Sequence, residues 1–338
     1  MISVIMICRN QSWNIARLIE SVLQETASFP NTQITLLDSL STDSTLEIAR
    51  RYPIDILRFL PNARLTTNIG RYVGYTVSRG EFLLFLDGDM QLSRGWVQQA
   101  LAVFSAQPQV AVITGATIDV PVNSDTVVED ESLLPTDPAQ IPLPFIGGAG
   151  MYRRAVLEKI GPFNPWLISD GEPELCIRIR QKGYQVMMLD RPMVYHFSDP
   201  TDKISTMIGR WRRRLYMGFG QNLRNKLGTE YFWPYFWERG YGCAPLLVLA
   251  LGAATLATSL VTRQAGWFLA WLALVILVLI ADALRKKSLY RMVYSLVQRT
   301  LVTAGTVRGF FITPQRPEDF PMQYEVIQQA SPTADKDS

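Results

Sequence analysis

An apolar run, Phe82–Leu86, stops abruptly at the acidic triplet Asp87-Gly88-Asp89. A run this apolar is typical of a strand that is covered on both faces of a sheet. Side chains two residues apart on an extended chain point the same way, so Asp87 and Asp89 can converge. Their carboxylates would suit a hard cation such as Mg²⁺ or Mn²⁺, which leaves positions open for the oxygens of a diphosphate. Asp-Gly is also a common turn signal, so the motif alone leaves both interpretations open.

The composition separates a mixed region from an apolar one. Charged residues make up 19% of the chain, against about 25% in a typical soluble protein, and the deficit lies after Gly242. This predicts a membrane portion beside one domain of about 200 residues. The net charge of +3 is too small to indicate a nucleic-acid partner, so none is expected.

The cysteines and the N-terminus bear on the compartment. Cys8, Cys176 and Cys243 are too widely spaced for a disulfide framework or a metal-ligand pattern, which indicates a reducing environment. The N-terminus lacks the pattern of a secretory signal, because Arg9 follows only a strand-length run, Ile2–Ile7. We therefore expect the first domain to stay in the cytoplasm.

Residues 1–200 alternate short apolar runs with helical stretches, which is the pattern of an α/β domain. The acidic, proline-rich segment 121–144 has neither a helical nor a strand period and is predicted to be a long surface loop or lid. The expected strands are Ile2–Cys8, Ile34–Asp38, Ile56–Leu60, Phe82–Asp87 and Val110–Ile118. The expected helices are Ile15–Gln24, Ser44–Tyr52, Ile69–Ser78 and Gly95–Gln107.

Residues 201–242 are predicted to form a basic amphipathic segment that lies on a membrane. Apolar residues recur every four positions from Met207 to Leu223, while arginines such as Arg210 and Arg214 occupy other faces. The alternative is a helix packed into a protein core with its arginines in solvent.

Two uncharged stretches, Ala244–Thr262 and Ala265–Ala281, each approach the roughly 20 residues that a membrane-spanning helix needs. Residues 243–284 are therefore predicted to form a transmembrane hairpin, and two buried helices of a soluble domain are the alternative. The loop between the stretches carries only Arg263, whereas basic residues flank the hairpin outside both ends. The positive-inside rule then puts the first domain and the tail on the cytoplasmic side.

The remaining residues, 285–338, are expected to form a second amphipathic helix and a C-terminal tail. An apolar stripe from Leu289 to Val297 has helical spacing and suits a membrane interface. The end of the chain, Gln328–Ser338, is predicted to be disordered.

A further carboxylate, Asp38, ends the second expected strand. In open α/β sheets ligands bind at the carboxyl ends of the strands, where a carboxylate can accept hydrogen bonds from a base or a ribose. The residues that follow, Ser41–Thr45, are explained by turn chemistry and a helix N-cap. That explanation does not account for Asp38.

Several stretches, taken in order, resemble the motifs of one known family. They are Ile5–Asn10, Leu37–Thr45, Asn68–Gly74, Asp87–Asp89, Gly147–Arg154, Ile160–Phe163 and Glu172–Arg178. Together they are similar to those of membrane-associated glycosyltransferases of family 2. The resemblance implies a GT-A fold, which is a nucleotide-binding α/β domain with a mostly parallel mixed sheet. Amphipathic interfacial helices and the two-helix hairpin would follow it.

The resemblance also implies roles for individual residues. Asp38 would hold the nucleoside, Asp87 the ribose or the water shell of the metal, and Asp89 would bind Mg²⁺ or Mn²⁺ directly. Such a cation would neutralise charge on the departing nucleoside diphosphate. His196, the only histidine, is expected to contact the metal or the phosphates, although a lone histidine is more often structural.

Two arginines are assigned to the donor by the same resemblance. Arg9 belongs to the first matching stretch. Arg71 would add a cationic contact to the donor phosphates or sugar. A surface arginine on an amphipathic helix is the competing interpretation of Arg71.

The acceptor side departs from the family pattern, because Gly171 replaces the acidic neighbour that usually accompanies the base. Glu172 is the expected general base for the attacking hydroxyl, and Asp170 is the second candidate. Pro173 suits a helix start, which would place Glu172 where anions are favoured. Helix capping is the alternative role for either acid.

The resemblance thus implies an inverting transfer of sugar from a nucleotide-diphosphate donor to a lipid-linked or glycan acceptor. The reaction would take place at the cytoplasmic face of the cell (inner) membrane, with membrane lipids as further partners. A nucleotidyltransferase that makes sugar nucleotides is one rival, but Arg9–Trp13 has no glycine for a phosphate loop. A non-catalytic membrane-tethered binding protein is the other, and Gly171 is its only support.

Overall fold

The structure is a computed structural model that describes residues 1–61, 65–129, 135–198 and 204–330. The chain divides into two compact units. Unit 1 comprises Met1–Leu167, Gly171–Pro200 and Gln315–Ser338, and unit 2 comprises Ile168–Asp170 and Thr201–Pro314.

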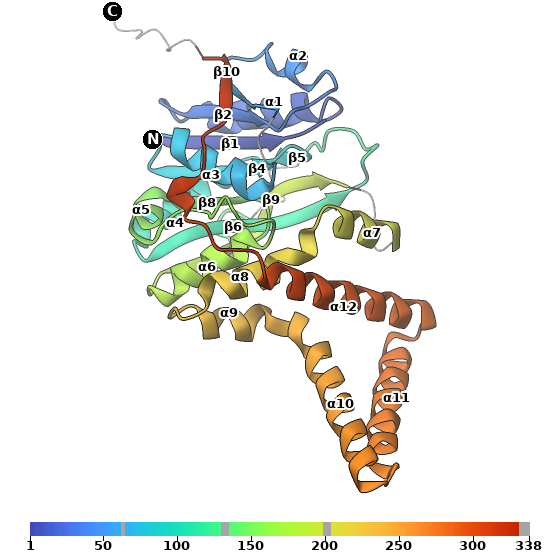
Figure 1. The fold of residues 1–338 in the computed structure, drawn as a ribbon. Coiled ribbons are helices and arrows are strands. Elements are labelled where there is room, and N and C mark those ends of the chain that lie inside the picture. The colour runs from blue at the N-terminus through green and yellow to red at the C-terminus, as the bar shows by residue number, and fades with distance from the viewer. Residues whose placement is uncertain (62–64, 130–134, 199–203, 331–338) are drawn as a thin grey trace, which may run out of the picture. The chain divides into compact units, whose positions relative to one another are not determined.

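Unit 1 is built on one mixed sheet, in which the described residues supply ten strands (Figure 1). The strand order is β10-β3-β2-β1-β4-β8-β6-β9-β5, and β7 pairs with β9. The strands are β1 Ile2–Cys8, β2 Gln33–Asp38, β3 Asp55–Phe59, β4 Phe82–Asp87, β5 Met90–Leu92, β6 Val110–Val120, β7 Gln140–Pro142, β8 Gly150–Arg153, β9 Gln185–Phe197 and β10 Tyr324–Gln328. The helices of unit 1 are α1 Ile15–Thr26, α2 Thr45–Ala49, α3 Thr67–Val77, α4 Trp96–Ala106, α5 Arg154–Ile160 and α6 Gly171–Gln181, with the 3₁₀ turn η4 Pro317–Asp319.

The centre of the sheet is parallel, as the fold class predicted. β1 lies between β2 and β4 and runs parallel to both, with Cys8 opposite Asp38 and Ile7 opposite Asp87. Parallel neighbours need crossover connections, which explains why α1, α2 and α3 alternate with these strands. β1 and β4 have the predicted bounds, and the ends of the other expected strands shift slightly.

Two hydrophobic clusters cover the two faces of the sheet. Alternate residues of β1 belong to different clusters, with Val4 in one and Ile5 in the other, because successive side chains of a strand point to opposite faces. Residues of α1 and α4 complete the first cluster, and residues of α3 and α6 complete the second. Burial on both faces accounts for the continuous apolarity of β1 and β4.

The C-terminal segment differs from the predicted tail. β10 pairs antiparallel with β3, with Val326 opposite Leu57, so residues 324–328 extend the sheet of unit 1. Gln328 therefore belongs to a strand and not to a disordered end, while residues 331–338 lie outside the described part of the chain. The sequence signal was weak because β10 is short and its partner strand is remote in the chain.

Part of the predicted loop 121–144 is anchored to unit 1. Gln91 donates to the carbonyl of Val127 at 2.8 Å and accepts from its backbone N–H at 3.0 Å. Gln140–Pro142 form β7, which pairs antiparallel with β9. Residues 130–134 of this segment lie outside the described residues.

Unit 2 is helical in its described residues. Its helices are α7 Ile204–Arg212, α8 Gly218–Lys226, α9 Phe232–Arg239, α10 Ala244–Thr262, α11 Gly266–Lys286 and α12 Leu289–Phe310, with the 3₁₀ turns η2 Leu215–Met217 and η3 Gly240–Cys243. The four-residue period from Met207 to Leu223 in the predicted amphipathic segment does not correspond to one helix. The chain breaks at Arg214, whose φ of 62° lies in the left-handed region.

The helix that follows this break packs closely against α12. A Cβ at Gly220 would overlap the backbone of Thr306 on α12, so α8 approaches α12 at a distance that only glycine permits. Leu223 of α8 is buried, which fits the core-packing alternative for this segment. The apolar residues of this segment therefore contact other parts of the protein and do not form one continuous exposed stripe.

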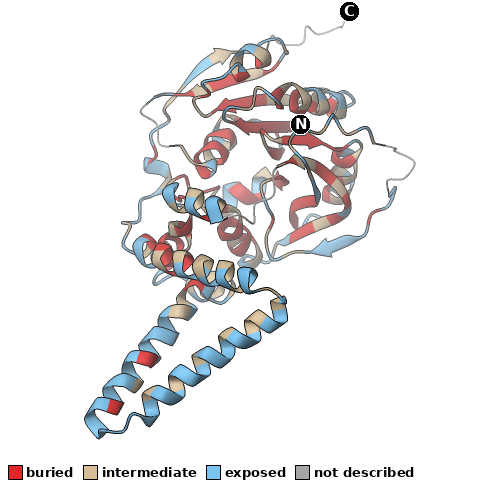
Figure 2. Cartoon of the chain, turned by 90° about the vertical axis from the view of Figure 1, so that its right-hand side faces the viewer, coloured by how far each residue is buried: buried red, intermediate tan, exposed pale blue. Residues whose placement is uncertain are grey.

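The predicted hairpin consists of α10 and α11. Both α11 and the segment Phe232–Thr262, which contains α10, are long and apolar enough to cross a membrane. Figure 2 shows the two helices almost entirely as exposed. At their turn, the backbone N–H of Phe268 donates to Ser259 Oγ at 3.0 Å.

Candidate active site

The end of β2 carries the first predicted site residue, Asp38, which is fully buried. Both of its carboxylate oxygens accept from the backbone N–H of Ser41, at 3.3 and 3.1 Å. The guanidinium of Arg58 on β3 lies 3.5 Å from Oδ2 of Asp38. Asp38 thus ends its strand with protein partners on both oxygens.

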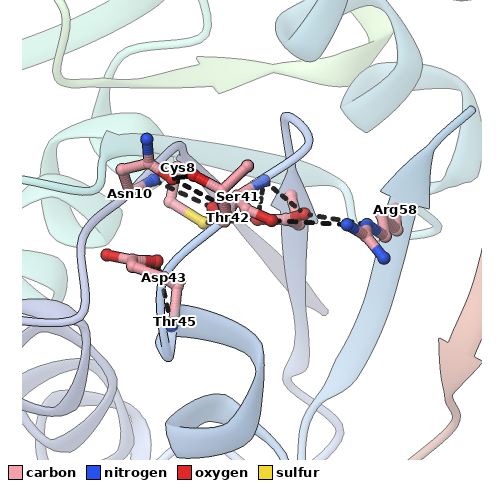
Figure 3. A network of polar contacts seen from close by, with 8 residues as sticks. Cys8, Asn10, Ser41, Thr42, Asp43, Thr45 and Arg58 are labelled. Atoms are coloured by element: carbon pink, nitrogen blue, oxygen red, sulfur yellow. Dashed lines mark hydrogen bonds and ion pairs between the residues drawn. The ribbon is translucent and has the colours of Figure 1, made fainter. Parts of the chain in front are cut away.

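The loops after β1 and β2 are joined by hydrogen bonds (Figure 3). The backbone N–H of Asn10 donates to Ser41 Oγ at 2.9 Å, and Thr42 N–H donates to Asn10 Oδ1 at 2.8 Å. Asp43 accepts from Ser12 N–H at 3.0 Å. Although burial opposes it, hydrogen bonds from Thr45 and Ser12 lower the pKa of Asp43 to about 2. These bonds hold the loops after β1 and β2 together.

Arg9 lies in the same loop after β1 and is exposed. Its neighbour Asn10 adopts a φ of 53°, in the left-handed region, where asparagine is tolerated better than most residues. The sequence-based assignment of Arg9 to the donor stays a prediction.

The backbone of the acidic triplet after β4 is held by Asn14, a residue that the sequence analysis did not single out. Its buried amide donates to the carbonyls of Gly88 and Met90, at 3.0 and 2.9 Å. A Cβ at Gly88 would lie 2.8 Å from Cβ of Cys8, so glycine lets the turn pack against β1. Asn14 lies next to Gly88 and Met90 only in the folded protein, and no local sequence motif marks it.

Asp89 and His196 lie together. His196 Nε2 is 3.4 Å from Asp89 Oδ2, and the other ring nitrogen, Nδ1, is 2.8 Å from Asp119 Oδ1. Asp89, followed by Asp119, raises the pKa of His196 to about 9 against the effect of burial. Asp89 Oδ1 is buried, and no described residue offers it a hydrogen bond. Asp119 was missed because a single acid on a strand has no sequence signature.

Arg71 on α3 contacts both the acid at the end of β4 and the acid at the start of α6. Its Nη2 lies 3.4 Å from Asp87 Oδ1 and 2.9 Å from Glu172 Oε1, and it donates to the carbonyl of Gly148 at 3.0 Å. Because Arg71 is only 1% exposed, its interpretation as a surface arginine is wrong. Burial raises the pKa of Asp87 to about 6, although Arg71 opposes this shift.

Glu172 lies in the first turn of α6, as expected from Pro173, which follows it. The departure at Gly171 has a steric reason, since a Cβ there would overlap Oδ1 of the buried Asn68. The amide of Asn68 in turn donates to the carbonyl of Leu167 at 3.0 Å. An acidic side chain at position 171 is excluded by packing, so Gly171 does not indicate a lost base.

Asp170, the second candidate base, lies in unit 2 with a φ of 63°. Its carboxylate accepts a hydrogen bond from Tyr235 Oη and forms an ion pair with Arg239. The side chain of Asp170 is 4% exposed. A carboxylate bound in this way contributes to the packing of unit 2, which favours Glu172 as the candidate base.

The arrangement fits a cation that binds together with substrate phosphates. Among the described residues, no three His, Cys, Asp or Glu side chains form a complete metal-ligand set. Mg²⁺ and Mn²⁺ sites at phosphates need only one or two protein ligands, because phosphate oxygens and water fill the rest. The unpaired Oδ1 of Asp89 and the adjacent imidazole of His196 match such a partial set.

Sequence comparisons agree with this geometry. Residues 3–161 match the model of the family described as Glycosyl transferase family 2. Glycosyltransferase AglE of Haloferax volcanii is 27% identical over 198 residues, which cover 55% of this chain and 63% of that protein. Polypeptide N-acetylgalactosaminyltransferase 6 of Bos taurus is 30% identical over 129 residues, which cover 36% of this chain and 20% of that protein. The matches thus span less than two thirds of either relative.

Solved structures share the fold. The mannosyltransferase PcManGT of Pyrobaculum calidifontis, solved with GDP-Man and Mn²⁺, superposes with a TM-score of 0.58 at 18% identity. The match covers 92% of this chain and 87% of that one. GalNAc-T7, solved with UDP, GalNAc and Mn²⁺, has a TM-score of 0.55 at 16% identity, with 71% of this chain and 50% of that chain covered. Residues 3–161, just under half of the chain, are therefore similar to Glycosyl transferase family 2, and unit 1 shares the GT-A fold of the solved structures.

Proposed function

We propose that this protein is an inverting, metal-dependent glycosyltransferase that moves a sugar from a nucleoside-diphosphate donor to a lipid-linked or glycan acceptor. One observation carries the proposal. The buried guanidinium of Arg71 contacts Asp87 at the donor-side strand end and Glu172 at the start of α6. The guanidinium of Arg71 thereby links Asp87, the acid assigned to the donor, with Glu172, the acid assigned to the acceptor.

The donor would bind at the carboxyl ends of β2, β1 and β4. The hydrogen-bonded loops around Asp38 suit a nucleoside, and the exposed Arg9 offers its charge to phosphates. Two solved proteins of the same fold contain GDP-Man with Mn²⁺ and UDP with Mn²⁺, which supports a nucleoside-diphosphate sugar as the donor class.

Departure of the nucleoside diphosphate leaves negative charge on its phosphates. A cation bound by Asp89 and His196 would stabilise that charge as a Lewis acid. Asn14 would keep the backbone of the acidic triplet in place through its bonds to Gly88 and Met90. Its role is thus to hold Asp89 at the geometry that binding requires.

Glu172 would act as the general base. Its bond to Arg71 orients the carboxylate, and its place in the first turn of α6 favours a negative charge. It would take the proton of the acceptor hydroxyl while the bond between the anomeric carbon and the diphosphate breaks. A single displacement needs no covalent intermediate and inverts the anomeric centre.

The acceptor would be presented at the cytoplasmic face of the cell membrane. Within unit 2, a cavity of about 810 Å³ lies among α10, α11 and α12. Its walls include apolar residues such as Val248 and Leu274, and Arg299 and Gln298 line its α12 side. An apolar space with a cationic rim suits a lipid chain with an anionic head group. The end of α11 and the start of α12 carry Arg285, Lys286, Lys287 and Arg291, which favour the cytoplasmic side for this end of the hairpin.

The test incubates the purified full chain with Mn²⁺ and a panel of sugar nucleotides. We expect one donor to be hydrolysed or transferred, and Asp89→Asn to lower this turnover by about 1,000-fold or more, since metal and transition-state charge stabilisation are lost. Asp190→Asn, at an exposed carboxylate on β9, is the matched control and should keep wild-type turnover. Full activity of Asp89→Asn would contradict the proposal. With pyrophosphate added, formation of a nucleoside triphosphate from the sugar nucleotide would identify a nucleotidyltransferase, and no reaction with any donor would favour a binding protein.

A further inference from the structure

A carboxylate outside the predicted motifs, Asp119, lies behind His196. Asp119 is on β6, and its Cα pairs with that of His196 on the neighbouring parallel strand β9. The Nδ1 atom of His196 is 2.8 Å from Asp119 Oδ1, while Nε2 faces Asp89 Oδ2 at 3.4 Å. The imidazole is therefore held between two carboxylates, one on each ring nitrogen.

An irregularity in the sheet creates this contact. Gly115 pairs with Leu189, so an unbroken register would place Asp119 opposite Met193, whose side chain is buried in the core. The register shifts between Gly115 and Thr117 and brings Asp119 opposite His196 instead. Irregularities of this kind re-aim side chains and are over-represented beside active sites.

We propose that Asp119 is a positioning residue that accepts a hydrogen bond from Nδ1–H of His196 and thereby leaves Nε2 free to bind the divalent cation with Asp89. A neutral imidazole carries one N–H, and the partner of one nitrogen decides which nitrogen can ligate a metal. A carboxylate behind a metal-binding histidine fixes both the tautomer and the ring orientation. This inference rests on the proposed use of a divalent cation at Asp89.

A surface ion pair is the simpler account of the same contact. The side chain of Asp119 is 77% exposed, and exposed pairs contribute little to stability. That account predicts that removing the Asp119 charge has no effect on metal binding. The two accounts therefore differ in a measurable quantity, the affinity of the site for the cation.

The chain contains one histidine, so its imidazole signals can be assigned without ambiguity. The experiment uses the full chain, ¹⁵N-labelled in detergent micelles, and titrates Mg²⁺ or Mn²⁺ in the presence of UDP or GDP. Long-range ¹H–¹⁵N spectra report which ring nitrogen carries the proton. We expect Mg²⁺ to shift the Nε2 signal, Nδ1 to stay protonated, and Mn²⁺ to broaden the ring signals.

In Asp119→Asn, the Mn²⁺ concentration for half-maximal broadening should rise by about 10-fold or more. Asp119→Glu should restore part of the affinity, and Asp190→Asn should leave it unchanged. Thermal unfolding of each variant checks that the fold is intact. Equal Mn²⁺ affinity in wild type and Asp119→Asn would overturn the role of Asp119 and leave the proposed function standing. If Mn²⁺ leaves the ring signals of wild-type His196 unchanged while the donor turns over, the role of Asp119 is overturned as well. Absence of any donor turnover would count against the proposed function itself.

Discussion

The ends of β2 and β4, on either side of β1, differ in how the protein satisfies their polar atoms. At the end of β2, both oxygens of Asp38 accept hydrogen bonds from its own loop. At the end of β4, Asp89 Oδ1 and the neighbouring Arg71 Nη1 are buried with no hydrogen-bond partner among the described residues. Buried polar atoms without partners are rare in proteins and call for an explanation. The carboxylate of Asp38 thus has hydrogen-bond donors within the protein for both oxygens, whereas Oδ1 of Asp89 has none among the described residues.

The two ends also differ in the range of their contacts. Asp38 bonds to Ser41, only three residues along the chain. Arg71, by contrast, reaches Asp87 and Glu172, which lie on other elements. A site assembled from distant segments depends on the packing of the whole domain, so substitutions there should affect stability as well as chemistry.

The largest stability effect is expected for Arg71→Met. The change leaves the half-buried carboxylates of Asp87 and Glu172 close together without a cation, and breaking a buried pair costs about 3 kcal/mol. Urea denaturation of the full chain measures this loss, and donor turnover should fall as well. Arg79→Met, at an exposed arginine just after α3, is the control and should change stability by less than about 0.5 kcal/mol. Equal stability of the two variants would show that the contacts of Arg71 with Asp87 and Glu172 do not stabilise the fold.

A smaller effect is expected for Gly171→Ala. The added Cβ overlaps Asn68 Oδ1, and overpacking of this kind costs about 2 kcal/mol. The double variant with Asn68→Ala should recover part of the loss, because the obstructing side chain is gone. Gly147→Ala has open space around its Cβ and serves as the control. If the two single changes simply add in the double variant, steric exclusion by Asn68 is not the reason for glycine at this position.

The smallest change is expected for Asp38→Asn. The new amide presents a donor to Ser41 N–H and loses the charge that pairs with Arg58, at a cost of about 1 kcal/mol. Because Asp38 is proposed to bind the nucleoside in the ground state and the transition state alike, KM for the donor should rise while kcat changes little. Steady-state kinetics with the accepted sugar nucleotide separates the two constants. A fall in kcat at constant KM would place Asp38 in the chemical step instead.

Some parts of the site could be predicted from the sequence because they are local. Asp38 and Asp87 each end an apolar run, so the run predicts the strand and the next acid marks its carboxyl end. The first turn of α6 was signalled by Pro173 directly after Glu172. Periodicity and adjacent motifs also gave the parallel core of the sheet.

Other parts follow from contacts between residues far apart in the chain, which leave no local pattern. Asn14 holds the backbone of Gly88, Asp119 meets His196 only through a register shift, and Asn68 requires glycine at position 171. The pairing of β10 with β3 likewise depends on a remote partner strand. The sequence by itself determined the strands β1 to β4, the acidic ends of β2 and β4 and the resemblance of the domain to a known family, because these depend on short-range spacing. Only the tertiary structure decided which distant side chains enclose those ends, because that choice depends on the close packing of whole elements.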